Sequence, residues 1–207
     1  KKKKKLWYNT KEGDKMKIKR IVAYIIDFFI VSIISSLIFC LPFFNKYNNE
    51  YQEITSEYLK LIANSGSEEI DYDIESQLLY DMSKSSQPLS IINCGTIILY
   101  FGILSFILNG QTLGKKIMKI KVAPLEGNKL NPNLYMIREI IVTNLIPKIL
   151  SIIALAFLNK SNWLIAQNII GYLSNITLFL IIGFMIFRDD ERGLHDIICK
   201  TNVIEVK

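Results

Sequence analysis

The sequence predicts an all-α membrane protein, a four-transmembrane-helix bundle with cytoplasmic interfacial segments and a short acidic extracytoplasmic insertion. The first observation is that apolar residues gather in four runs, each near the ~20 residues that a helix needs to cross a hydrocarbon core. The runs are residues 21–44, 89–108, 140–158 and 164–187. A soluble fold would have to bury four such helices completely within 207 residues, with little amphipathic material to cover them.

The second observation is the distribution of charge, because Lys and Arg are enriched on the cytoplasmic side of a membrane protein. Residues 1–20 hold ten Lys and Arg, 109–139 hold six and 188–207 hold four, whereas 45–88 hold three Lys against nine Asp and Glu. This pattern predicts a multi-pass protein of the cell membrane with both termini in the cytoplasm. The net charge of +6 then serves contact with anionic lipid of the bilayer, and no nucleic-acid partner is expected.

The first span, residues 21–44, follows the basic N-terminus and contains a single charged residue, Asp27. Arg20, Ala23 and Asp27 stand at i, i+3 and i+7 and therefore share one helix face. An aspartate inside a span costs about 3 kcal/mol on insertion scales. Asp27 is therefore expected to have either a partner or a function.

The acidic segment 45–88 is the only sizeable piece predicted outside the bilayer. Apolar residues at helical spacing predict two short amphipathic helices, near residues 51–62 and 70–82, with a break at 64–67. The acidic residues fit a solvated surface, since the spacing of an EF-hand is missing.

After the second span, residues 109–139 open on a Gly-Gln-Thr-Leu-Gly-Lys-Lys stretch, residues 110–116. Its spacing does not match a phosphate-binding P-loop. Leu113, Ile117 and Ile120 share one helical face and the lysines around them share the other, which predicts an interfacial helix on anionic lipid. Residues 119–122 fit a short strand equally well, and residues 123–136 read as a loop.

The third span, residues 140–158, has one charged residue, Lys148, next to Pro147, which is expected to kink the helix. Asp27 lies ~9 Å and Lys148 ~12 Å along their helices from the predicted cytoplasmic ends, at 1.5 Å per residue. Opposite charges in a low dielectric attract strongly, so we predict that Asp27 and Lys148 pair directly or through water. Arg20 and Arg138 are the alternative partners of Asp27.

The fourth span, residues 164–187, is uncharged, and the cytoplasmic segment 188–207 follows it. Residues 201–206 alternate like a short strand. His195, the only histidine, is one turn from Cys199, but no further Cys/His cluster accompanies them. We therefore expect no metal site and no cofactor.

Three blocks of this sequence resemble the RDD family of bacterial membrane proteins, named for one arginine and two aspartates. They are Arg20-x-x-Ala23-x-x-x-Asp27, the stretch 110–116, and Leu194-His195-Asp196-Ile197-Ile198. Their order and their placement relative to the spans also match, so the likeness covers nearly the whole chain as one domain. The resemblance implies that Arg20, Asp27 and Asp196 are the name-giving residues. It also implies supporting roles for Ala23, Gly110, Gln111, Thr112, Gly114, Lys115 and His195.

Some members of that family are described as cation/proton antiporters, so the resemblance implies transport of monovalent cations in exchange for protons. A carboxylate inside a span is able to hold a proton and a small cation in turn, which is what antiport requires. In this hypothesis Asp27 titrates, Lys148 competes with the cation, and Arg20 and Asp196 form a cytoplasmic gate. Four helices are few for a transport path, so a homo-oligomer is expected.

The alternative hypothesis is a non-catalytic accessory or scaffold subunit of a larger membrane complex. Arg20, Asp27, Lys148 and Asp196 would then hold the helices in register, and the acidic segment 45–88 would be the partner surface. An enzyme is not expected, and no catalytic residues are assigned, because the spans contain no Ser/His or paired-Asp arrangement.

Overall fold

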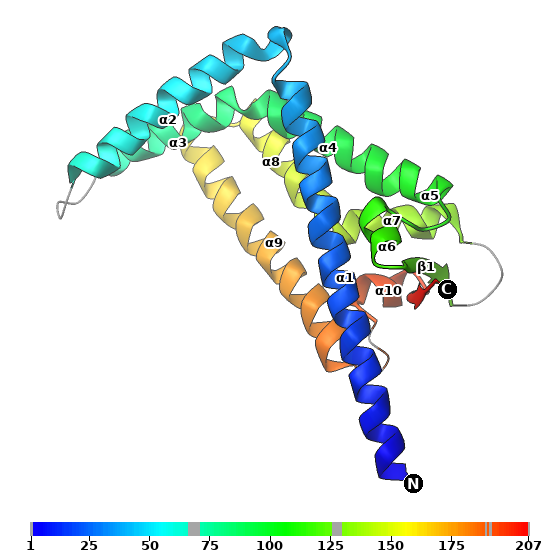
Figure 1. The fold of residues 1–207 in the computed structure, drawn as a ribbon. Helices are drawn as coiled ribbons and strands as arrows, with labels where there is room; N and C mark the ends of the chain where they lie inside the picture. Colours follow the sequence, from blue (N-terminus) through cyan, green and yellow to red (C-terminus); the bar gives the residue numbers. More distant parts are fainter. Residues whose placement is uncertain (1, 66–70, 126–129, 189, 191, 207) are drawn as a thin grey trace. The chain divides into compact units, whose positions relative to one another are not determined.

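The computed structural model describes residues 2–65, 71–125, 130–188, 190 and 192–206 (Figure 1). Most of the described residues are helical. The chain divides into two compact units. The first comprises Lys1–Ser32, Ile97–Leu145 and Asn175–Lys207, and the second comprises Ile33–Thr96 and Ile146–Ser174.

Among the described residues, three helical stretches are long and apolar enough to cross a membrane. The first is Lys15–Phe39 within helix α1 (Lys2–Phe39). The second, Gln87–Ile107, is built from α4 (Gln87–Ile97), a π-helical segment η2 (Ile98–Leu104) and α5 (Ser105–Ile107). The third is α9 (Lys160–Phe187). These helices bear out the prediction of a multi-pass, mostly helical membrane protein.

The third predicted span differs from the prediction. Residues 140–158 do not form one helix kinked at Pro147; they belong to α7 (Pro132–Val142) and α8 (Leu145–Phe157), which meet at 66°. The break falls at Asn144, whose φ of 55° is left-handed and ends the helix before it. Pro147 then lies in the first turn of α8, where the missing N–H costs no helical hydrogen bond. The described residues thus hold three candidate spans, or four if the bent pair counts as one.

Helix α7 also replaces the second half of the predicted loop 123–136. Asn131 caps its N-terminus by accepting from the backbone N–H of Asn133 at 3.0 Å, and Pro132 follows as the first helical residue. An Asn cap followed by proline is a strong start signal, because proline has no N–H to leave unpaired there.

The first unit contains a small sheet beside its helices. Strand β1 (Ile120–Pro124) pairs antiparallel with β2 (Thr201–Glu205), with Val122 opposite Val203. Helix α6 (Leu113–Ile117) precedes β1, and α10 (Leu194–Ile198) precedes β2. Both strands were suggested by the sequence. Their inward residues form a core together with α1 and α7, made of Ala23, Ile120, Val122, Tyr135 and Val203.

The second unit contains the two helices predicted for the acidic segment, α2 (Asn45–Ser65) and α3 (Tyr72–Ser85), which run side by side (Figure 1). Its buried cluster is Tyr80, Ala154, Leu155 and Trp163. The Tyr80 hydroxyl donates to the carbonyl oxygen of Leu158 at 3.2 Å. Ser151 and Gln167 hydrogen-bond each other, so the polar side chain of Ser151 faces protein.

Candidate functional site

Asp27 is completely buried at the N-terminus of helix α6. One carboxylate oxygen accepts from the Tyr100 hydroxyl at 2.6 Å and from the Gly114 N–H at 2.7 Å, and the other accepts from the Thr112 hydroxyl. The Tyr100 oxygen in turn accepts from the Leu113 N–H. The Thr112 oxygen accepts from the Lys115 N–H as the helix cap. Asp27 therefore satisfies, directly or through one hydroxyl, the first N–H groups of α6.

The residues of the Gly-Gln-Thr-Leu-Gly-Lys-Lys stretch have separate structural tasks around this contact. A Cβ on Gly114 would lie 2.8 Å from the Asp27 carboxyl carbon and closer still to the Ala23 carbonyl oxygen, so only glycine allows this approach. Gly110 has a φ of +82°, and a Cβ there would meet the Val122 carbonyl oxygen at 2.6 Å. The Gln111 amide donates to the carbonyl oxygen of Ile120 at 3.0 Å. The stretch thus fastens α6 to α1 and to β1.

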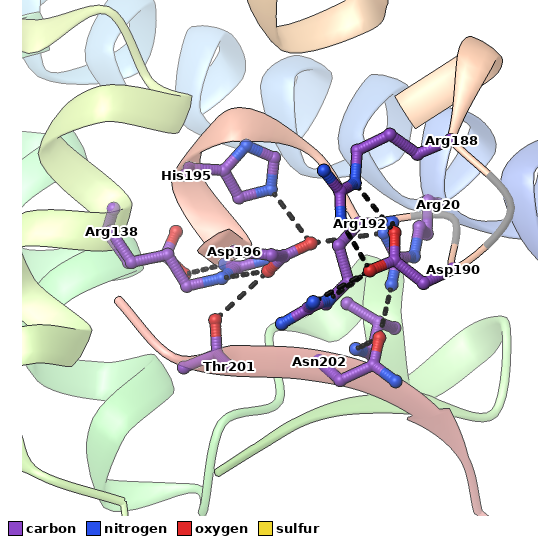
Figure 2. Close-up of polar contacts among 11 residues, drawn as sticks. Arg20, Arg138, Arg188, Asp190, Arg192, His195, Asp196, Thr201 and Asn202 are labelled. Carbon is purple, nitrogen blue, oxygen red and sulfur yellow. Dashed lines mark hydrogen bonds and ion pairs between the residues drawn. The ribbon is translucent and has the colours of Figure 1, made fainter. Parts of the chain in front are cut away.

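The second aspartate, Asp196, is also completely buried and lies among cations (Figure 2). Its oxygens accept from Arg20 Nη1 at 3.1 Å, from Arg138 Nε at 3.0 Å and from the Thr201 hydroxyl at 3.1 Å. His195 Nε2 lies 3.3 Å from the same carboxylate. Arg20 also donates to the Asn202 side chain at 3.1 Å. This cluster ties α1, α7, α10 and β2 together.

Electrostatics fix the charge states in this cluster. Burial alone would raise the pKa of Asp196, but the guanidinium groups of Arg138 and Arg20 and the contact with His195 hold it well below its usual value. Burial and the positive charge of Arg138 lower the pKa of His195, while the carboxylates of Asp196 and Glu139 raise it; the net shift is downward. Asp196 is therefore ionised and His195 neutral near pH 7.

A third buried carboxylate, Glu139, pairs with a lysine. Glu139 Oε1 accepts from Arg138 Nη1 at 2.5 Å and from Lys115 Nζ at 3.4 Å. The Lys115 side chain is only 12% exposed and that of Glu139 only 3%. Burial lowers the pKa of Lys115, and the Arg138 charge adds to this, while the carboxylates of Glu139 and Asp27 oppose it. Lys115 was predicted to share the polar face of an interfacial helix with the neighbouring lysines, but the structure buries it against Glu139.

These groups line one cavity within the first unit, with a volume of about 210 Å³. Its polar wall includes Arg20, Asp27, Lys115, Arg138, Glu139 and His195. Its apolar wall comes largely from α9, through Leu178, Ile181, Ile182 and Met185. The cavity thus combines a cluster of buried charged side chains with hydrophobic side chains of α9, which is long and apolar enough to cross a membrane.

The structure brings most of the predicted site residues into this unit, but with different pairings. Arg20 and Arg138, the alternative partners of Asp27, bind Asp196 instead. The Asp27 carboxylate is held by uncharged donors. Lys148 belongs to the second unit and is half-buried near Cys94, so its pairing with Asp27 stays a prediction.

Glu139 and Tyr100 are the residues that reasoning from the sequence missed. Glu139 was visible as a carboxylate next to Arg138 at the edge of an apolar run, which is a costly place for two charges. Tyr100 gave no such signal, because a tyrosine in an apolar helix fits lipid contact equally well. Its role depends on a contact with a residue 73 positions away.

Comparison with known proteins gives one match. The model of the RDD family matches residues 17–200, which include α1 from Lys17 onward, both short helices α6 and α10, and strand β1. No curated protein and no solved structure matches this chain.

Proposed function

We propose a function from one premise: the chain belongs to the RDD family of membrane proteins. On our proposal it exchanges a monovalent cation for a proton across the membrane. Lys115 carries the proton, and the cation takes its place beside Glu139 when Lys115 is neutral. We place the protein in the cell membrane with both termini in the cytoplasm, since the distribution of Lys and Arg favours that orientation.

One observation carries this proposal: a lysine and a glutamate are buried together in a cavity, with Nζ 3.4 Å from Oε1. A buried lysine loses its proton more readily than a solvated one, as the lowered pKa of Lys115 indicates. Asp27 is less suited to bind a cation from solution, because its carboxylate oxygens are already held by three donors. We therefore assign the exchange to Glu139 and Lys115 and give Asp27 the task of positioning α6.

The exchange follows from charge balance. With Lys115 protonated, its ammonium group lies beside Glu139, in addition to the guanidinium group of Arg138. When Lys115 releases its proton, a cation from solution takes that place, and the total charge of the cavity is unchanged. If protonated Lys115 and the cation occupied the cavity at the same time, one positive charge would be left unbalanced in a low dielectric, which is costly. The cavity therefore holds a proton on Lys115 or a cation, in turn.

Flux through reconstituted protein tests the proposal. Purified protein is placed in vesicles that contain a pH-sensitive dye, and Na⁺, K⁺, Li⁺ or methylammonium is added outside, with protein-free vesicles measuring the leak. We expect a saturable pH change with at least one cation. Lys115→Arg should abolish it, because arginine keeps its proton. Lys115→Met should abolish it as well, because methionine carries no proton to exchange.

Lys116 provides the matched control, since it is the exposed neighbour of Lys115 on the same helix. Lys116→Arg and Lys116→Met should leave flux unchanged. Wild-type protein that gives no flux with any of these cations refutes the proposal. Co-purification with one stoichiometric partner, together with absent flux, would favour the accessory-subunit role instead.

A further inference from the structure

Glu139 Oε2 and His195 Nδ1, which belong to two residues lining the cavity, have no hydrogen-bond partner among the described residues. The two residues are 3% and 6% exposed. An unpaired buried polar atom costs about 1–3 kcal/mol, so such atoms call for an explanation. Both residues line the cavity, so a ligand held there is able to reach them.

Both unpaired atoms are hydrogen-bond acceptors. Glu139 Oε2 is a carboxylate oxygen and has lone pairs only. The Nε2 of His195 faces the Asp196 carboxylate at 3.3 Å, which assigns the proton of the neutral ring to Nε2 and leaves a lone pair on Nδ1. A ligand that satisfies these two atoms must therefore bring hydrogen-bond donors.

The remaining wall sets the second requirement. Leu178, Ile181 and Ile182 from α9 present alkyl groups to the cavity. Its volume of about 210 Å³ exceeds the roughly 150 Å³ of an engineered apolar cavity that binds benzene. A bare metal cation suits it poorly, because hard cations take about six or more oxygen ligands and this wall offers one free carboxylate oxygen and one ring nitrogen.

We infer that the cavity binds an alkylammonium ion, a protonated primary amine with an apolar body. The ammonium group donates to Glu139 Oε2 and His195 Nδ1, and the alkyl chain packs against α9. The inference names the ligand of the cavity and in that respect rests on the proposed exchange function.

The charges around Lys115 agree with a cationic ligand. Lys115 faces Glu139 and Arg138 from α7 and Asp27 from α1. Arg138 is already paired with Asp196 and Glu139, and Arg20 with Asp196. With Lys115 neutral, three carboxylates stand against two guanidinium groups, which leaves one negative charge for the ammonium group to balance. Binding of the ligand therefore releases the Lys115 proton.

Calorimetric titration of the purified full-length chain in detergent tests this inference. The probe is hexylammonium, and hexyltrimethylammonium and hexanol are the matched comparisons, because the first keeps the charge without N–H donors and the second lacks the charge. Hexylammonium should bind saturably. Hexyltrimethylammonium and hexanol should each bind at least about tenfold more weakly, because neither is able to donate charge-assisted hydrogen bonds. Titrations in two buffers of different ionisation enthalpy should show proton release, which Lys115→Met removes.

Variants separate the site from general partitioning. Glu139→Gln should weaken hexylammonium about tenfold or more. Ile181→Trp fills the cavity without touching the charged cluster and should abolish binding, whereas Leu180→Trp, on the same helix but outside the cavity, should not. Equal binding of hexyltrimethylammonium or hexanol, or full binding by Ile181→Trp, overturns the inference. Binding of hexylammonium without any proton flux in vesicles supports the inferred ligand and refutes the exchange function. Na⁺-driven proton flux without hexylammonium binding supports the exchange function and refutes the inferred ligand.

Discussion

Replacing Asp27 tests the assignment of this residue as the group that fastens α6. In Asp27→Ala, the hydroxyls of Tyr100 and Thr112 and the N–H of Gly114 lose their acceptor. At about 1–3 kcal/mol for each unsatisfied buried donor, the loss is about 3–9 kcal/mol, comparable to the total stability of many domains. Asp27→Asn keeps one carbonyl acceptor, and the Thr112 hydroxyl is free to rotate and accept from the new amide, so it should lose much less.

The assay is equilibrium unfolding of detergent-purified variants, followed by vesicle flux. Thr112→Val serves as a milder variant in case Asp27→Ala does not fold, and should cost about 1–2 kcal/mol as the loss of a helix cap. Asp27→Asn should retain proton flux in proportion to folded protein. Asp27→Ala with stability within about 1 kcal/mol of wild type would refute the capping role, and a well-folded Asp27→Asn without flux would return the titrating role to Asp27.

Three further predictions concern the same unit. Gly114→Ala should lower the unfolding midpoint, because its Cβ would lie 2.8 Å from the Asp27 carboxyl carbon, whereas Gly183→Ala, with nothing within 4 Å, should be neutral or gain up to about 1 kcal/mol. Arg138→Lys should lower the free energy of unfolding, measured by denaturant titration, by about 3–5 kcal/mol, because lysine cannot hydrogen-bond Asp196 and Glu139 at the same time. The control Arg188→Lys, at an exposed ion pair, should lower it by less than about 1 kcal/mol. Stability should fall from pH 7 to pH 5, because His195, facing Asp196, Arg138 and Glu139, has a lowered pKa when folded and the unfolded chain takes up the proton first. His195→Asn should flatten that slope in unfolding curves at the two pH values, and an unchanged slope would contradict the assignment.

The helical class and the membrane setting were predictable because length and hydrophobicity alone define a span. The first and fourth apolar runs correspond to α1 and α9, although α1 begins well before residue 21. Residues 140–158 were predicted wrongly as one helix because hydropathy cannot register a backbone change at a single residue. Asn144 breaks the helix through its φ angle, and both flanking segments stay apolar.

Most residues of the candidate site were predictable from the sequence, but Glu139, Tyr100 and the pairings were not. Asp27 stood out because a charge inside a span is costly, and Arg20 shares its helix face. Asp196 was indicated only by the resemblance to the RDD family. Which acid meets which base depends on contacts across long sequence separations, such as Arg20 with Asp196, 176 residues apart. Helical periodicity placed Lys115 on the polar face of an interfacial helix, with the other lysines. The contact with Glu139 overrides that periodicity, because α6 has only five residues and its orientation is set by Asp27.

The π-helical segment Ile98–Leu104 makes this part of the chain tolerant of one particular change in length. Tyr100 lies inside the segment and reaches Asp27, while Ser105, directly after it, hydrogen-bonds Tyr135. A π-helix accommodates an extra residue by bonding i to i+5. Deleting one residue between Tyr100 and Ser105 should therefore restore α-helical pairing and leave both hydroxyls facing their partners. The same deletion in an ordinary α-helical stretch would rotate everything beyond it by about 100°, so a deep mutational scan should tolerate single-codon deletions better inside this segment than in α4.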